Sequence, residues 1–124
     1  MLNKIEKAWQ NWIKTAFEFK AINDNEIQVL TPFTDAFGDG ILFNVRQDGN
    51  DYTLTDNGYL LWNLGINGMD VGKLQALIDK ILKQFGFTRT NNDEILRKNV
   101  KMEKLPQAMM EFVELILQLS YLSR

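Results

Sequence analysis

Three aspartates are the residues of this chain whose type and spacing could do chemistry. Asp35, Asp39 and Asp56 lie near the ends of expected strands, with Thr55 and Tyr52 close by in the sequence. Carboxylates that converge at strand ends can hold Mg²⁺ through oxygen ligands, as in metal-dependent nucleases. These aspartates therefore define one alternative for the chain, a metal-dependent nuclease-like enzyme.

The same aspartates also occupy positions where carboxylates shape the backbone. Asp39 precedes Gly40 in an expected turn, and Asp56 stands where a carboxylate accepts backbone N–H bonds and meets a helix dipole. The strand after Asp39 carries Asn44 and Arg46 and lacks the Asp/Glu-x-Lys sequence that such nucleases usually carry. We therefore expect backbone shaping, with no catalytic residue, no metal and no cofactor.

Composition excludes several other classes of chemistry. The chain has 124 residues, without cysteine or histidine, so disulfides, thiolates and the commonest general base are missing. With 45% hydrophobic residues it suits a single domain, residues 1–124. No run approaches the roughly 20 apolar residues of a membrane-spanning helix. The charged N-terminal residues do not resemble a signal peptide, so we expect a cytoplasmic protein without membrane contact.

Charge is distributed unevenly along the chain. Residues 18–70 hold nine acidic and two basic residues, a net charge of −7, whereas residues 73–104 hold eight basic and four acidic residues, a net charge of +4. Such asymmetry marks either a partner surface or two segments that pair with each other. No helix-turn-helix pattern accompanies the basic residues, so we expect no nucleic-acid binding.

The N-terminal segment has the apolar spacing of an amphipathic helix. Apolar residues recur every three or four positions from Leu2 to Phe17, with lysines and amides between them. Trp9 and Trp12 lie on this apolar stripe and are flanked by further apolar residues. We expect both tryptophans in the core.

The sheet is predicted from short alternating runs separated by turn residues. The predicted strands are residues 26–30, ended by Pro32, then 41–47 and 52–54, which form a hairpin around Asp48-Gly49, and a weaker hairpin at 87–97. Short connections between consecutive strands favour antiparallel pairing.

Helices are predicted on either side of these strands. They comprise a short helix from Tyr59 ended by Gly65, a central helix capped by Asp70 and ended by Gly86, and a last helix from Leu105-Pro106 to about Leu122. The fold class is therefore α+β, a small antiparallel sheet with an N-terminal, a central and a C-terminal helix.

The last helix is apolar around much of its circumference. Met110, Leu117 and Tyr121 lie outside its main apolar stripe. A helix that is apolar on more than one side is either buried or binds something. We expect these residues to form a homodimer surface if they are exposed.

Four motifs resemble the domain of unknown function 1828 family. They are Thr31-Pro32-Phe33, Gly38-Asp39 before a strand, the segment YTLTDNG from Tyr52 to Gly58, and Gln84-Phe85-Gly86 at a helix end. The resemblance covers most of the chain from Trp9 onward. It implies a small bacterial or phage-borne domain of uncharacterised activity, sometimes joined to a second domain, and it supplies no catalytic residues.

Together these features favour a non-enzymatic protein-binding module. Its small size, its lack of histidine and cysteine, and its uneven charge motivate this expectation. One specific form is a phage or mobile-element inhibitor of a host defence protein that acts by surface occlusion. The expected binding residues are Asp35, Asp48 and Asp51 in the acidic segment and Met110, Leu117 and Tyr121 on the last helix.

Overall fold

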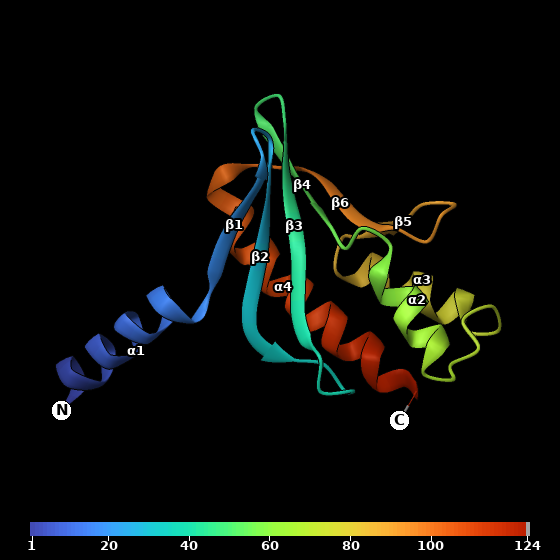
Figure 1. Ribbon diagram of the computed structural model, residues 1–124, viewed down its shortest axis with the longest axis horizontal. Coiled ribbons are helices and arrows are strands. Elements are labelled where there is room, and N and C mark those ends of the chain that lie inside the picture. The colour runs from blue at the N-terminus through green and yellow to red at the C-terminus, as the bar shows by residue number, and fades with distance from the viewer. Residues whose placement is uncertain (124) are drawn as a thin grey trace.

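An antiparallel sheet organises the chain, and α4 lies along one of its faces (Figure 1). The computed structural model describes residues 1–123. Within them the strand order is β1-β2-β3-β4-β6-β5, antiparallel throughout. The strands are β1 (Glu18–Asn23), β2 (Glu26–Thr34), β3 (Gly40–Asp48), β4 (Asp51–Thr55), β5 (Thr88–Arg89) and β6 (Ile95–Val100).

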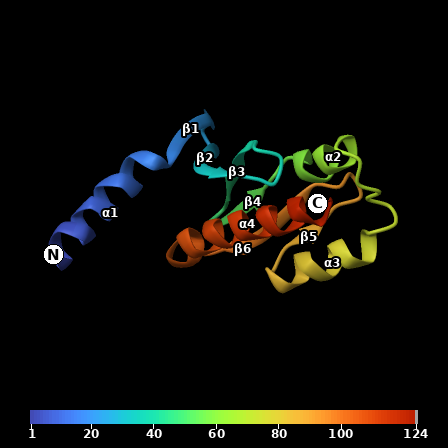
Figure 2. The same cartoon turned by 90° about the horizontal axis from the view of Figure 1, so that it is seen from below.

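Helices precede, interrupt and follow the strands, so the predicted α+β class is confirmed. They are α1 (Leu2–Ala16), α2 (Tyr59–Ile66), α3 (Gln75–Gln84) and α4 (Leu105–Ser120), with 3-10 turns at Met102–Lys104 and Tyr121–Ser123. Seen from below, α4 runs along the sheet with α2 and α3 on either side of its C-terminal half (Figure 2). The predicted N-terminal, central and C-terminal helices are all present.

The core lies between the sheet and α4. Ile41, Phe43 and Val45 alternate along β3 and are all buried, as the period-2 pattern predicts. Phe112 of α4 is fully buried, and its ring centroid lies 5.0 Å from that of Phe43 and 4.5 Å from that of Phe87. Burying a side chain of this size stabilises the fold by about 1.5–3 kcal/mol.

The N-terminal helix lies outside this core. No residue of α1 is buried, and Trp9 and Trp12 remain 58% and 45% exposed. Figure 1 shows α1 extending away from the sheet, at the opposite side from α2 and α3. The expectation that both tryptophans belong to the core is wrong, because α1 leads directly into a strand at the sheet edge and none of the other described elements buries its apolar stripe.

The first strands differ from the prediction in two ways. β1 was not predicted, although its residues alternate and the turn at 24–25 joins it to β2 in a hairpin. The expectation that Pro32 ends the next strand is also wrong, because β2 continues to Thr34. The pairing with β1 stops at Leu30, and the pairing with β3 shifts between Leu30 and Thr34. Proline's missing N–H is therefore tolerated at this irregular position.

Helix boundaries also differ where glycine or aspartate was taken as a stop or a cap. Gly65 does not end α2, which runs on to Ile66. Asp70 does not cap the central helix, because its Oδ1 accepts a hydrogen bond from the Lys73 N–H and closes a separate turn. α3 begins only at Gln75. The predicted hairpin at 87–97 and the start of α4 at Leu105 are confirmed.

Candidate functional site

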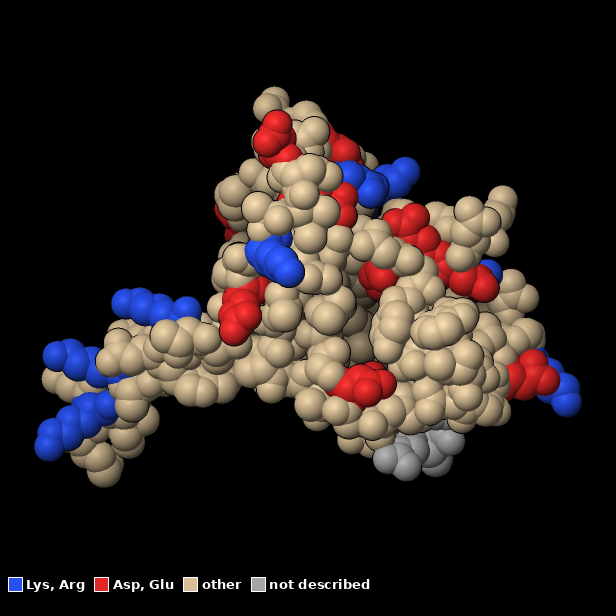
Figure 3. Space-filling model, viewed as in Figure 1, with Lys and Arg blue, Asp and Glu red and all other residues tan. Residues whose placement is uncertain are grey.

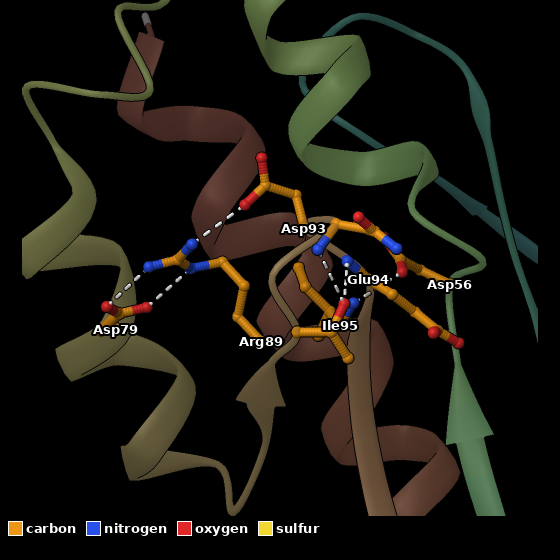
Figure 4. A network of polar contacts seen from close by, with 8 residues as sticks. Asp56, Asp79, Arg89, Asp93, Glu94 and Ile95 are labelled. Carbon is orange, nitrogen blue, oxygen red and sulfur yellow. Dashed lines mark hydrogen bonds and ion pairs between the residues drawn. The ribbon is translucent and has the colours of Figure 1, made fainter.

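Asp56 joins three elements through its carboxylate. Oδ1 accepts hydrogen bonds from the N–H groups of Gly58 and Ile95 at 2.8 and 2.9 Å, and Oδ2 accepts one from the Leu60 N–H at 2.9 Å. Figure 4 shows this carboxylate facing the start of β6. Burial raises the pKa of Asp56, the three backbone donors oppose that rise, and nearby Glu94 adds to it. The expectation that this carboxylate accepts backbone N–H bonds at the start of α2 is confirmed.

Asp35 shapes the loop before β3 in a similar way. Its Oδ1 accepts hydrogen bonds from the N–H groups of Phe37 and Asp39 at 2.9 and 3.1 Å, and its own N–H donates to the Asp39 carbonyl at 2.8 Å. The Asp35 side chain is buried, whereas Asp39 is exposed. The carboxylate of Asp35 therefore holds a turn whose next residues begin β3.

The three aspartates do not gather as a cation site. Among residues 1–123, no group of three or more acidic side chains is placed so that it could hold a metal ion. Thr55 donates its hydroxyl hydrogen to Glu94, so this neighbour also has a structural partner. Asp35 and Asp56 have the backbone contacts expected of structural carboxylates.

The other acidic residues expected to bind a partner lie at the far end of the hairpin. Asp48 accepts a hydrogen bond from the Thr53 hydroxyl at 2.6 Å, and Asp51 accepts one from Lys101 Nζ at 2.7 Å. Asp35 lies before the start of β3 and Asp48 at its end, so the length of that strand, roughly 26 Å, separates them. Asp35 therefore does not form one continuous acidic surface with Asp48 and Asp51.

The expected dimer residues, on α4 and the turn after it, offer little apolar surface. Met110 and Tyr121 are exposed, but Leu117 is half-buried and packs against the core. Leu115, two residues before Leu117, is fully buried. Much of the apolar circumference of α4 is therefore used by the fold, because α2, α3 and the sheet surround it.

A larger apolar surface surrounds α2. A cavity of about 230 Å³ opens between the start of β3, the start of α2 and α4. In Figure 3 it is the hollow beside the sheet, with acidic side chains at its lower margin. Its lining consists of Asp35, Gly40, Ile41, Leu42, Asp56, Tyr59, Leu60 and Ile116. Apolar side chains predominate, as is usual for binding cavities.

Exposed apolar side chains continue from this cavity along α2. We call Leu42, Tyr59, Trp62 and Ile66 the α2 patch; their exposed fractions range from 44% to 62%. The Tyr59 and Trp62 ring centroids lie 5.8 Å apart. Burial raises the pKa of Tyr59, and the negative charges of Asp39 and Asp35 raise it further. The patch is therefore apolar with acidic groups at its margin.

The second unpartnered apolar surface is the N-terminal arm, residues 1–16. Leu2, Ile5, Trp9 and Trp12 line one side of it, and the two indole centroids lie 5.4 Å apart. Its charged side chains are Lys4, Lys7, Lys14 and Glu6, a net charge of +2. Lysines project from the arm at the left of Figure 3.

Sequence reasoning missed both surfaces as exposed sites. The segment Tyr59–Ile66 is apolar on nearly every side, and Tyr59, Trp62 and Ile66 have the spacing of one helical face. A short helix that packs on a core needs apolar residues on one side only. The additional apolar residues of this segment were therefore the available sign of an exposed apolar face. For the arm, no signal in the sequence distinguishes a covered stripe from an uncovered one.

Fold and surfaces define a small α+β domain with two separate apolar faces. The chain belongs to the family described as Domain of unknown function DUF1828, which matches residues 31–119. The arm and β1 precede the matched segment. Searches of curated proteins and of solved structures gave no match. No helix in residues 1–123 has the length and apolar character to cross a membrane.

Proposed function

We propose that the protein is a non-enzymatic protein-binding module of the cytoplasm and that the arm is its main binding element. One observation carries this proposal: α1 presents a one-sided apolar stripe with two tryptophans, yet none of its residues is buried. Contiguous exposed apolar patches on soluble proteins usually mark interaction sites. Tryptophan is also enriched among residues that dominate binding energy at protein interfaces.

The physics of short helices supports the same proposal. An isolated helix of 15 residues is marginally stable in water, and most helices in proteins are held by packing of their apolar face. Directly after the arm, Phe17 packs edge-on against Phe33 of β2 with 5.9 Å between ring centroids, and residues 1–12 of the arm are all exposed. A partner that covers the stripe would supply the missing packing.

The acidic sheet face gives this proposal a more specific form. On the face opposite α4, the strand register places Glu18, Glu26, Asp48 and Asp51 beside Lys20 and Arg46. Figure 3 shows this face with more acidic than basic side chains on the sheet. Such a surface suits an inhibitor, carried by a phage or mobile element, that occludes a basic site on a host defence protein.

A capture experiment with matched baits tests the module. Wild-type protein, the double variant Trp9→Ala/Trp12→Ala and the control Leu77→Ala would be immobilised and exposed, over a salt series, to bacterial lysate that also contains the untagged chain. Leu77 is an exposed apolar residue of α3, away from the arm. We expect a stoichiometric protein partner that wild type and the control retain and the double variant loses.

The salt series separates the two surfaces. Binding through the acidic face weakens as salt screens the charges, whereas binding through the apolar stripe persists. Equal recovery of the same proteins by all three baits would contradict the role of the arm. Charge reversal at Glu26 then tests the acidic face separately. The same change at Asp70, which lies outside the sheet, is its control.

A further inference from the structure

Building on the proposed binding role of α1, we propose that the arm's partner is a second copy of this chain. The arm of each copy lays its apolar stripe on the α2 patch and the adjoining cavity of the other. The result is a closed two-fold dimer in which both apolar faces of each chain are covered. Isologous pairing of this kind is the commonest form of soluble oligomer.

The arm cannot reach the α2 patch of its own chain. α1 ends at Ala16, only Phe17 separates it from β1, and β1 is held to β2 by its ladder. β1 is an edge strand, and β2 and β3 lie between it and β4, which leads into α2. Figure 1 accordingly shows α1 and α2 on opposite sides of the molecule. Covering the α2 patch with an arm therefore requires a second chain.

The cavity has room for an aromatic side chain. An apolar cavity of roughly 150 Å³ accepts benzene, and this one measures about 230 Å³ and opens onto the exposed rings of the α2 patch. Trp9 and Trp12 lie on the same side of the arm, so one indole fits the cavity while the other packs on Tyr59 or Trp62. Aromatic pairs of this kind favour offset or edge-on contact.

Charge favours the encounter of these two surfaces. Lys4, Lys7 and Lys14 lie on the side of α1 away from the stripe, by helical spacing. The net charge of +2 on the arm therefore acts at long range on the receiving surface, which carries Asp35 and Asp39 at its margin. Among the described residues, no lysine or arginine lines the cavity.

The area of contact also favours reciprocal exchange. A helix of 15 residues is about 22 Å long and about 10 Å wide, so half of its surface covers about 350 Å². One docked arm then buries about 700 Å² in total, below the range of about 1,200–2,000 Å² for specific interfaces. Two reciprocal contacts bury about 1,400 Å² and reach that range.

Complementation in the full-length chain tests the exchange. One variant carries Trp9→Ala and Trp12→Ala on the arm, and the other carries Tyr59→Ala and Trp62→Ala in the α2 patch. Each variant alone weakens both contacts of its homodimer. In a mixed dimer the wild-type arm of one chain meets the wild-type patch of the other, so one of the two contacts is restored.

We expect sedimentation equilibrium to show a dimer for wild type, weaker dimers for each variant alone, and an intermediate affinity for the equimolar mixture. Leu77→Ala removes an exposed apolar side chain of α3 outside both surfaces, and this control should dimerise like wild type. A mixture that associates no more tightly than either variant alone would overturn reciprocal exchange.

Tryptophan fluorescence provides an independent readout. All three tryptophans of the chain belong to the two surfaces, Trp9 and Trp12 on the arm and Trp62 in the α2 patch. Their emission should shift to shorter wavelength as wild type is concentrated. Trp9→Ala/Trp12→Ala should weaken dimerisation at least about 100-fold, while circular dichroism shows that the sheet and α4 remain folded.

The outcomes separate this inference from the proposed function. A wild-type chain that stays monomeric, or a dimer that the arm variants leave unchanged, would overturn the second copy as partner. Growth beyond a dimer would overturn the closed two-fold arrangement. If the monomeric chain still captures another protein through Trp9 and Trp12, the proposed function stands and only the identity of the partner changes.

Discussion

α1 and α4 have nearly the same length, 15 and 16 residues, and both are amphipathic, yet the fold uses them differently. α4 buries residues along its whole length, from Leu105 to Ser120, whereas α1 buries none. The difference lies in what stands beside each helix. α4 follows β6, which is paired on both sides, by β4 and β5, and α4 returns across the sheet face, while α1 precedes an edge strand.

The family match follows the same division. Residues 31–119 include β3, β4, β6 and nearly all of α4, and they exclude α1 and β1. The matched segment therefore contains most of the elements that build the core, together with the α2 patch, while core residue Val29 of β2 precedes it. The arm is an addition at the sheet edge, so changes there should affect association, whereas changes in the core should affect stability.

The largest effect is expected in the core. Phe112→Ala removes a fully buried ring that contacts Phe43 and Phe87, and it should lower the free energy of unfolding by about 3–5 kcal/mol. Urea unfolding followed by circular dichroism measures the loss. A change below 1 kcal/mol would mean that α4 is not packed on the sheet as described.

The next largest effect is expected at Asp56. Asp56→Asn replaces one carboxylate oxygen by an amide that cannot accept a backbone N–H bond, so at least one buried donor at Gly58, Leu60 or Ile95 loses its acceptor. We expect a loss of about 1–3 kcal/mol in unfolding free energy. The control Asp39→Asn changes an exposed side chain and should shift stability by less than about 0.5 kcal/mol.

The same pair of variants tests the nuclease alternative. The assay measures cleavage of single- and double-stranded nucleic acid with Mg²⁺ or Mn²⁺. We expect no metal-dependent cleavage by wild type, and therefore no difference between wild type and Asp39→Asn. Metal-dependent cleavage that disappears in a folded Asp39→Asn protein would show that the aspartates do chemistry as well as shape the backbone.

A smaller, pH-dependent effect is expected at the ion pair between α3 and β5. Arg89 Nε and Nη2 each donate to one Asp79 oxygen at 2.9 Å, and Nη1 donates to Asp93 at 3.0 Å (Figure 4). The hydrogen bond from Arg89 lowers the pKa of Asp79 below its usual 3.8. This contribution is therefore present above pH 3.8 and is lost as the pH falls through the lowered pKa.

Asp79→Asn should remove that dependence. Because Asp79 is half-exposed, we expect a loss of about 0.5–1 kcal/mol at neutral pH and a smaller difference from wild type at the acid end. Thermal unfolding at a series of pH values measures the difference. An equal gap between the two proteins at every pH would show that ionisation of Asp79 is not its cause.

The smallest effect on stability is expected in the arm. Trp12→Ala, measured at dilutions where the chain is monomeric, should change the unfolding free energy by less than about 0.5 kcal/mol, because the side chain is 45% exposed and lies outside the core cluster. A loss of unfolding free energy comparable with that of Phe112→Ala would mean that α1 packs on the core of its own chain. The contrast between α1 and α4 would then be wrong.

Local patterns predicted much of the fold. The alternation of Ile41, Phe43 and Val45 identified β3 and its buried face, and the residue types from Thr55 to Gly58 identified the cap of α2. β1 was missed because its six residues follow a helix pattern without a strong break. The contact of Asp56 with Ile95, 39 positions away, was beyond any local pattern.

The sequence by itself determined which residues share a face, since helical and strand periods follow from backbone geometry. It also determined the charge of each segment and the absence of histidine and cysteine. Only the tertiary structure decided which faces are covered, because coverage depends on where distant elements come together. That is why the stripe of α4 became core, while the equally regular stripe of α1 remained open to a partner.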